Sequence, residues 1–190
     1  PPSVGSNIVV VSSSFGSGVL YKNIQKKYFI DQKETYGKQF IIRDSLVALN
    51  WVLQKETKNI GEYTCFKATY DIEASNFTLD GDQSANLPVS REVTAWYTPQ
   101  IPISNGPSQY HGLPGLILEV NDGDMTILCS SITLNPKDGV KIYEPKKGSK
   151  VSQADYNKII LKKSKEMSEQ YRSKSSNSES GNITIEYIEQ

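Results

Sequence analysis

The chain contains a single histidine, His111, on which every histidine-based catalytic or metal-binding site would depend. A Ser–His–Asp triad, a Cys–His pair and a multi-histidine metal site each use an imidazole as base or ligand. The motifs that usually mark such sites, Gly-x-Ser-x-Gly, His-Glu-x-x-His and Cys-x-x-Cys, do not occur in the sequence. We therefore expect His111 to pack in or on its loop, and we expect no catalytic residue, no metal and no cofactor.

Two short acidic clusters carry the oxygen ligands that calcium prefers. They are Asp80-Gly81-Asp82 and Asn121-Asp122-Gly123-Asp124. Neither continues to the glutamate that a calcium loop places at its twelfth position, so turn chemistry is the favoured interpretation. The glycines of Phe15–Gly18, followed by Lys22, lack the spacing of a phosphate-binding loop, and a flexible entry loop explains them.

The two cysteines, Cys65 and Cys129, both fall in strand-like runs. A disulfide between them would close a loop whose chain entropy is worth about 4 kcal/mol. Such a bridge also requires an oxidising compartment. The alternative is two small buried thiols, and the sequence leaves both interpretations open.

The segment 96–118, here called the proline/glycine segment, concentrates residues that restrict the backbone or free it. They are Pro99, Pro102, Gly106, Pro107, Gly112, Pro114 and Gly115. Such a segment has a strongly restricted path, and loops of this kind usually present a binding surface. Rigid aromatic rings suit protein binding, but the rings of this segment would equally fill a core beneath the loop. The candidate partner-binding residues are Trp96, Tyr97, Pro99, Tyr110, His111, Leu113 and Pro114.

Short runs rich in β-branched and aromatic residues follow one another along the chain and predict β-strands. They are Ile8–Val11, Gly18–Tyr21, Lys27–Ile30, Lys38–Asp44, Leu46–Gln54, Tyr63–Ile72, Val93–Tyr97, Leu116–Val120, Met125–Leu134 and Val140–Tyr143. A succession of strands without intervening helices predicts an antiparallel meander. Residues 73–90 are polar and longer than a usual hairpin loop, which predicts an irregular segment.

One helix is predicted, over residues 152–172. Ser152 and Asp155 match a capping box at its start. An apolar stripe at helical spacing follows, formed by Tyr156, Ile159, Ile160, Met167 and Tyr171. We expect this stripe to pack on the sheet, with partner binding as the alternative. Residues 173–181 predict a flexible linker, and residues 182–190 predict a terminal strand that pairs within the chain or with another chain.

Length and charge limit the classes of protein that fit. The length of 190 residues suits a single domain spanning residues 1–190. Lysine and arginine total 21, as do aspartate and glutamate, so no overall field favours nucleic acid or an anionic membrane. Local basic runs such as Lys146-Lys147 are interpreted as solvated faces. No apolar stretch approaches the ~20 residues that cross a bilayer, so no transmembrane segment is expected.

Three blocks of the sequence resemble the GLPGLI family. Asp44–Leu53 is similar to the family's Asp…Trp strand, and Lys58–Thr69 resembles its Gly-Tyr-x-Cys-x-Lys-Ala block. Ala95–Ile103 and Gly112–Ile117 are similar to the family signature. The resemblance implies an exported, β-rich protein of the Gram-negative envelope, periplasmic or associated with the outer membrane, in a family without an established activity. It also implies association with outer-membrane transport proteins. Residues 73–90 look longer than the family's usual passage, and the N-terminal strand region looks shorter.

The sequence thus predicts an α+β fold, mainly β, in which a curved antiparallel sheet or half-barrel meander carries one C-terminal amphipathic helix packed on it. The expected function is non-enzymatic: an envelope binding or accessory protein that associates with an outer-membrane or other envelope protein through residues 96–118. The alternative is a half-barrel carrier of an apolar ligand such as lipid or a lipoprotein.

Overall fold

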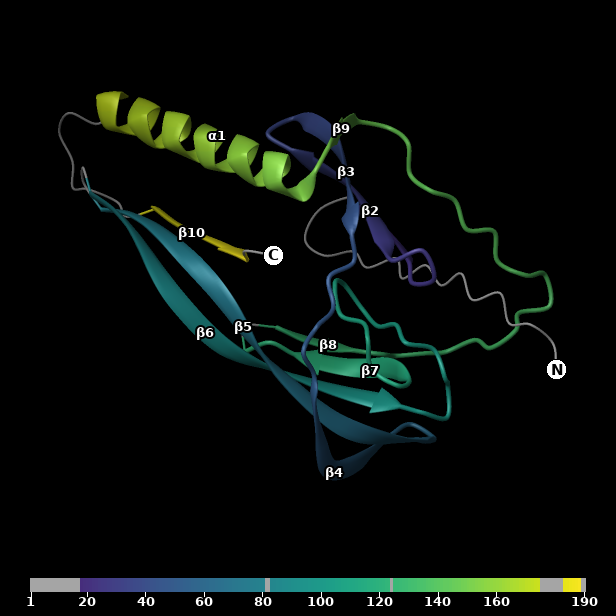
Figure 1. The fold of residues 1–190 in the computed structure, drawn as a ribbon. Helices are drawn as coiled ribbons and strands as arrows, with labels where there is room; N and C mark the ends of the chain where they lie inside the picture. The colour runs from purple at the N-terminus through teal and green to yellow at the C-terminus, as the bar shows by residue number, and fades with distance from the viewer. Residues whose placement is uncertain (1–17, 81–82, 124, 175–182, 189–190) are drawn as a thin grey trace. The chain divides into compact units, whose positions relative to one another are not determined.

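The computed structural model describes residues 18–80, 83–123, 125–174 and 183–188. Over these residues the chain is mostly β-strand with one α-helix near the C-terminus (Figure 1), so the predicted mainly-β α+β class is confirmed. The strands form two sheets where we predicted one. The chain divides into two compact units: the first combines residues 1–70 with 92–151, and the second combines residues 71–91 with 152–190.

One sheet lies entirely in the first unit and has the order β1-β2-β3-β9. Its strands are β1 (Val19–Asn23), β2 (Tyr28–Thr35), β3 (Lys38–Ser45) and β9 (Ser149–Val151). The first three pair antiparallel, and β9 joins β3 in parallel. Tyr21, Ile30 and Ile41 form a buried cluster against which Tyr28 and Ile142 pack. The burial of these side chains holds the later segment around Ile142 against the sheet.

The other sheet has the order β10-β5-β6-β7-β8, and β4 also pairs with β5. Its strands are β4 (Val52–Ile60), β5 (Tyr63–Asp80), β6 (Gln83–Thr98), β7 (Leu116–Asn121), β8 (Thr126–Leu128) and β10 (Ile183–Ile188). In the first unit, β4 pairs antiparallel with the first part of β5, and β7 pairs antiparallel with β6. The ladder between β6 and β7 closes the base of the proline/glycine segment.

The prediction that residues 73–90 are irregular is wrong, because β5 and β6 continue through this segment on either side of residues 81–82. Polar composition did not prevent strand formation, since strand preference depends on pairing more than on intrinsic propensity. β10 adds a third strand here, with Ile183 opposite Leu79 and Ile188 opposite Ala74. The predicted terminal strand therefore pairs within its own chain.

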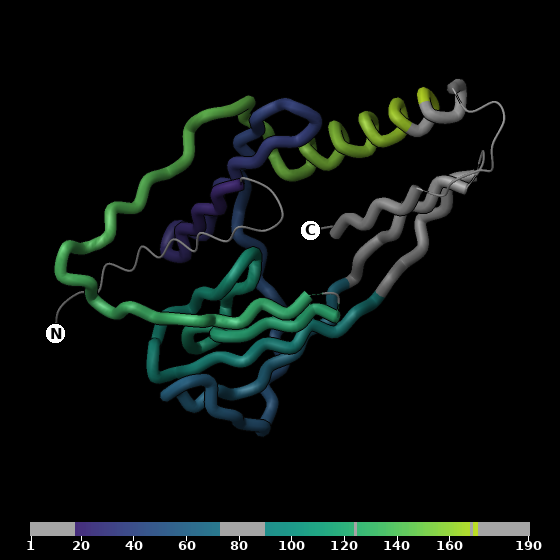
Figure 2. The backbone as a smooth tube through the Cα atoms, turned by 180° about the vertical axis from the view of Figure 1, so that it is seen from behind, coloured from purple at the N-terminus to yellow at the C-terminus, as the bar shows by residue number. Residues whose placement is uncertain are grey.

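Three other strand predictions need correction. The run Leu46–Gln54 is strand only from Val52, and β4 extends instead to Ile60. The run Met125–Leu134 contains only the three residues of β8. Val140–Tyr143 is not a strand: residues 129–148 connect β8 to β9 without helix or strand (Figure 2). The predicted strand Ile8–Val11 lies outside the described residues.

The helix α1 (Gln153–Lys174) begins at the predicted cap. The backbone N–H of Asp155 donates to Oγ of Ser152 at 3.1 Å, and Oγ of Ser152 donates to Oδ2 of Asp155 at 2.8 Å. In the predicted stripe Tyr156 is buried and Met167 is exposed, while the packing of the stripe on a sheet stays a prediction. Most of the predicted linker 173–181 lies outside the described residues. Among the described residues, no helix combines the length and apolar character needed to cross a membrane.

Candidate functional site

The proline/glycine segment leaves β6 after Thr98 and returns to the sheet at Leu116, the residue paired with Thr98. Between these points the loop folds back against the start of β7, the strand into which it returns. The backbone N–H of Leu116 donates to the carbonyl of Ile101 at 3.0 Å, and the N–H of Ile117 donates to that of Asn105 at 2.9 Å. These bonds give the loop an internal framework, so its shape does not depend on side chains alone.

Lys22 on β1 is the first anchor of this loop. Its Nζ donates to the carbonyl of Gly106 at 2.8 Å and to the carbonyl of Tyr110 at 3.1 Å. Lys22 is only 2% exposed, and burial lowers its pKa from 10.5 to about 7. An amine in this position satisfies two backbone carbonyls and is closed to solvent, so its role is to hold the loop rather than to attack a substrate.

Trp51, which precedes β4, is the second anchor. Its indole Nε1 donates to the carbonyl of His111 at 2.8 Å. The neighbouring residue Gly112 has a φ of 97°, and a Cβ there would lie 3.8 Å from Cδ1 of Trp51. The indole also packs edge-on against Tyr70, with ring centroids 4.7 Å apart. The indole of Trp51 therefore holds the loop at His111 and Gly112.

Tyr110 provides a third anchor through its hydroxyl, which donates to Oδ2 of Asp122 at 3.0 Å. The other carboxylate oxygen of Asp122 accepts from the backbone N–H of Met125 at 2.9 Å. Asn121 likewise accepts from the N–H of Gly123 at 3.0 Å. The side-chain oxygens of Asn121 and Asp122 therefore bond within the protein, as the turn interpretation predicts for this cluster, whose last residue, 124, lies outside the described residues.

Two glycines of the segment are required by close packing. A Cβ on Gly115 would lie 2.2 Å from the carbonyl oxygen of Thr98. A Cβ on Gly106 would lie 2.7 Å from Cβ of Ile117. Real Cβ atoms do not approach other atoms this closely, so any side chain here would displace the loop from the strands.

The predicted partner-binding residues separate into two groups. Tyr97, Tyr110 and Leu113 are buried, because their side chains fill the core beneath the loop. Buried side chains cannot form an outer contact surface, so the partner-binding assignment of these three residues is corrected to core packing. Trp96 and His111 are half-buried, and Pro99 and Pro114 are exposed. Other exposed residues of the loop are Gln100, Pro102 and Gly112.

His111 packs into the loop, as expected. Its Nδ1 lies 2.9 Å from the carbonyl of Gln109, a contact in which Nδ1 carries the proton and donates. Burial lowers the pKa of the imidazole. Among the described residues, no group of three or more His, Cys, Asp or Glu side chains is placed to hold a metal ion.

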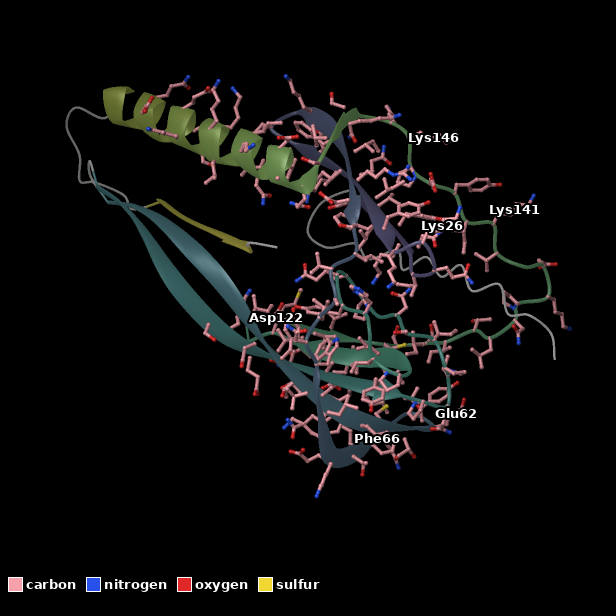
Figure 3. All side chains as sticks on the ribbon, viewed as in Figure 1. Lys26, Glu62, Phe66, Asp122, Lys141 and Lys146 are labelled. Carbon is pink, nitrogen blue, oxygen red and sulfur yellow. The ribbon has the colours of Figure 1, made fainter. Side chains whose placement is uncertain are left out.

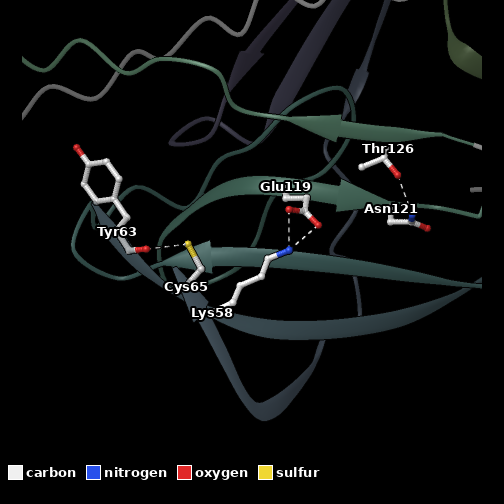
Figure 4. A network of polar contacts seen from close by, with 6 residues as sticks. All are labelled: Lys58, Tyr63, Cys65, Glu119, Asn121 and Thr126. Carbon is white, nitrogen blue, oxygen red and sulfur yellow. Dashed lines mark hydrogen bonds and ion pairs between the residues drawn. The ribbon is translucent and has the colours of Figure 1, made fainter. Parts of the chain in front are cut away.

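A second polar cluster joins β4 to β7 across the sheet (Figure 4). Nζ of Lys58 lies 2.7 Å from both carboxylate oxygens of Glu119 and 4.4 Å from the ring centroid of Trp96. Cys65, the cross-strand partner of Lys58, is fully buried, and burial raises the pKa of its thiol. Cys65 and Cys129 are both free thiols, so the candidate disulfide is not formed. The cluster orders Trp96, and the Cys65 thiol is protonated and shielded.

The sequence predicts the loop, but it does not predict that Lys22, Trp51 and Asp122 hold the loop in place. No local pattern marks Lys22 as an anchor, because its two acceptors lie more than eighty residues further along the chain. In the sequence, Trp51 stands out only as part of a block that resembles a family motif. The sequence predicts Asp122 as a turn residue, but its bond to Tyr110 follows from the tertiary fold alone.

Comparison with known proteins locates a shared region in this part of the chain. Residues 51–119 match a family described as Porph_ging, a protein of unknown function. The match begins at the anchor Trp51, includes the whole proline/glycine segment, and ends at Glu119, so it covers about a third of the chain. No curated protein and no solved structure gave a match.

Proposed function

We propose that this chain is a non-enzymatic binding protein that presents the outer residues of the proline/glycine segment to a protein partner. The observation that supports this proposal is the contrast between an anchored backbone and an exposed rim. Lys22, Trp51 and Asp122 hold the loop from within, while Pro99 and Pro114 remain at the surface. A loop already fixed in one conformation loses little entropy on binding.

A catalytic role has less support, because the reactive groups near the loop are occupied. The Lys22 amine is buried against two carbonyls, the Cys65 thiol is buried with a raised pKa, and Nδ1 of His111 is bonded to its own loop. Efficient nucleophiles and bases need access to substrate and a pKa matched to the reaction.

The proposed partner is a protein of the bacterial envelope, at the outer membrane or in the periplasm. This part of the proposal rests on the resemblance of the segment to the GLPGLI signature, whose Gly112–Ile117 string lies within the region that matches the Porph_ging family. We propose that the protein is exported from the cytoplasm and is periplasmic or associated with the outer membrane, as the resemblance implies.

Site-specific photocrosslinking tests the proposal. A photoreactive residue is placed at Pro99 or Pro114 in the full chain, expressed in its native envelope. The matched control carries the same group at Tyr36, an exposed residue in the turn between β2 and β3. We expect one dominant protein adduct from the two loop positions and none of that size from Tyr36. Equal adducts from all three positions, or none from the loop, would refute the proposal.

A second variant tests whether rigidity matters. Trp51→Phe removes the indole N–H that donates to the carbonyl of His111 and leaves an aromatic ring against Tyr70. The exposed rim is unchanged, so we expect a weaker adduct only if binding uses the anchored conformation. Tyr36→Phe is the control for an aromatic substitution away from the loop.

A further inference from the structure

Residues 129–148, here called the strap, connect β8 to β9 without regular secondary structure. Connections longer than about 12–15 residues are uncommon in compact domains and are often functional. The strap is fixed at its start, where the N–H of Cys129 donates to the carbonyl of Leu118 at 2.7 Å. Towards its end, Nε2 of Gln32 donates to the carbonyl of Lys147 at 2.6 Å, and the Tyr28 hydroxyl donates to Glu144. The strap is therefore a defined part of the first unit.

The strap exposes large apolar side chains. Tyr143 is 73% exposed and Val140 is 69% exposed, the two largest values among the exposed large hydrophobic residues that the structure describes. Half of those residues lie in or just before the strap: Met125, Leu128, Leu134, Val140 and Tyr143. Single exposed apolar residues are ordinary, but a concentration of them in one connection indicates a surface that contacts a partner or a membrane when the protein functions.

The same region is basic although the chain as a whole is neutral. The strap contains four lysines, Lys137, Lys141, Lys146 and Lys147, all exposed, against Asp138 and Glu144. The net charge of the strap is thus +2, whereas the chain total is +0. The contact between Tyr28 and Glu144 also brings the β1–β2 turn, with exposed Lys26 and Lys27, to the strap. Figure 3 labels Lys26, Lys141 and Lys146 on this part of the first unit. A neutral total therefore conceals a local basic surface.

We infer that the strap docks the first unit on an anionic lipid surface, with Leu134, Val140 and Tyr143 entering the interface and the lysines meeting the headgroups. Apolar side chains flanked by lysines are the combination that binds anionic membrane interfaces, and tyrosine favours the headgroup level. The apolar residues have no regular spacing, which a fluid lipid surface accepts and a protein groove of fixed register does not. This surface is separate from the proline/glycine segment, so it adds membrane attachment to the proposed protein binding.

Vesicle co-sedimentation of the full chain tests this inference, with phosphatidylglycerol–phosphatidylcholine vesicles compared with pure phosphatidylcholine. We expect binding to the anionic vesicles, weakened by added salt, and little binding to the neutral ones. Lys141→Gln/Lys146→Gln should lower the partition coefficient about thirtyfold, at the contribution typical of a lysine near an anionic surface. Val140→Ser/Tyr143→Ser should lower it about tenfold.

Matched controls use exposed residues of the same kinds elsewhere in the first unit. Lys38→Gln/Lys55→Gln removes the same charge, and Val52→Ser/Leu53→Ser removes a similar exposed apolar surface. Both controls should bind anionic vesicles within about threefold of the unchanged chain. Tryptophan fluorescence verifies that each variant is folded. The inference is overturned if the unchanged chain does not bind anionic vesicles, if either strap variant binds as well as it does, or if the controls lose as much.

Discussion

Replacement of Lys22 by methionine should remove a specific pH dependence of stability. In the unfolded chain the lysine keeps its proton up to about pH 10.5, whereas burial lowers its pKa in the folded unit to about 7. Between these values the unfolded state binds more protons than the folded state, so the free energy of unfolding rises with pH. Methionine retains most of the apolar stem but has no proton to lose, so this contribution disappears in Lys22→Met.

The size of the effect follows from the two pKa values. Nearly one proton separates the unfolded and folded states between pH 7.5 and 9.5, and each pH unit is then worth close to 1.36 kcal/mol. The lysine therefore contributes about 2 to 3 kcal/mol of added stability across this interval. Lys22→Met also leaves the carbonyls of Gly106 and Tyr110 without their donor, which opposes the relief of not burying an amine. The difference in pH slope is consequently the informative quantity, rather than the stability at one pH.

Urea unfolding followed by tryptophan fluorescence measures this slope. Both tryptophans, Trp51 and Trp96, lie in the first unit, so the signal reports on the part of the chain that contains Lys22. Other groups titrate in the same range, including the Cys65 thiol, whose pKa is raised by burial. Their contributions cancel when the variant is compared with the unchanged chain at each pH. If the free energy of unfolding has the same pH dependence in both proteins, the amine of Lys22 is not buried with a lowered pKa, and its anchoring role is refuted.

Three further substitutions test other contacts. Gly115→Ala should lower the free energy of unfolding, measured with urea, by more than about 3 kcal/mol, because the added Cβ meets the carbonyl of Thr98. The control is Gly61→Ala: the added Cβ has open space but the residue has a φ of 57°, so the loss should be about 1 kcal/mol. Tyr110→Phe removes the bond to Asp122 and should destabilise the first unit by about 1 kcal/mol in the same assay, and an unchanged midpoint would contradict that bond. Ser152→Ala removes the helix cap and should destabilise the helix by about 1 kcal/mol, so the helical circular dichroism signal should be lost at a lower temperature. Ser152→Asp keeps a capping side chain and should leave that temperature unchanged.

The positions of most elements could be predicted from the sequence because they depend on local chemistry. The helix start could be predicted from Ser152 and Asp155: Oγ of Ser152 accepts from the backbone N–H of Asp155 and donates to the carboxylate of Asp155. Residues 73–90 could not be predicted, since their strand structure comes from β5, β6 and the distant β10 pairing with one another. The division into two sheets was also missed, because the parallel contact of β9 with β3 joins segments about a hundred residues apart.

The connection between β6 and β7 could be predicted from its prolines and glycines, because they limit the backbone wherever they occur. Its role as a binding site stays a prediction. Which rings would face outward could not be predicted, since Tyr97 and Tyr110 are buried and pack beside rings from distant parts of the chain, Phe66 on β5 and Trp51 before β4. The anchors Lys22 and Trp51 are likewise visible only when β1 and the start of β4 are placed beside the loop.

The density of special residues in the proline/glycine segment has an interior explanation that changes what counts as evidence for binding. Gly106 and Gly115 are present because no side chain fits where the loop meets Ile117 and Thr98. A loop packed this tightly would require them even without a partner. The prolines are different: Pro99, Pro102 and Pro114 are exposed, where the packing that demands the glycines does not act on them. Proline at the surface stiffens the loop and leaves no unpaired N–H. The exposed prolines, rather than the glycines of the signature, are therefore the residues whose replacement most directly tests recognition.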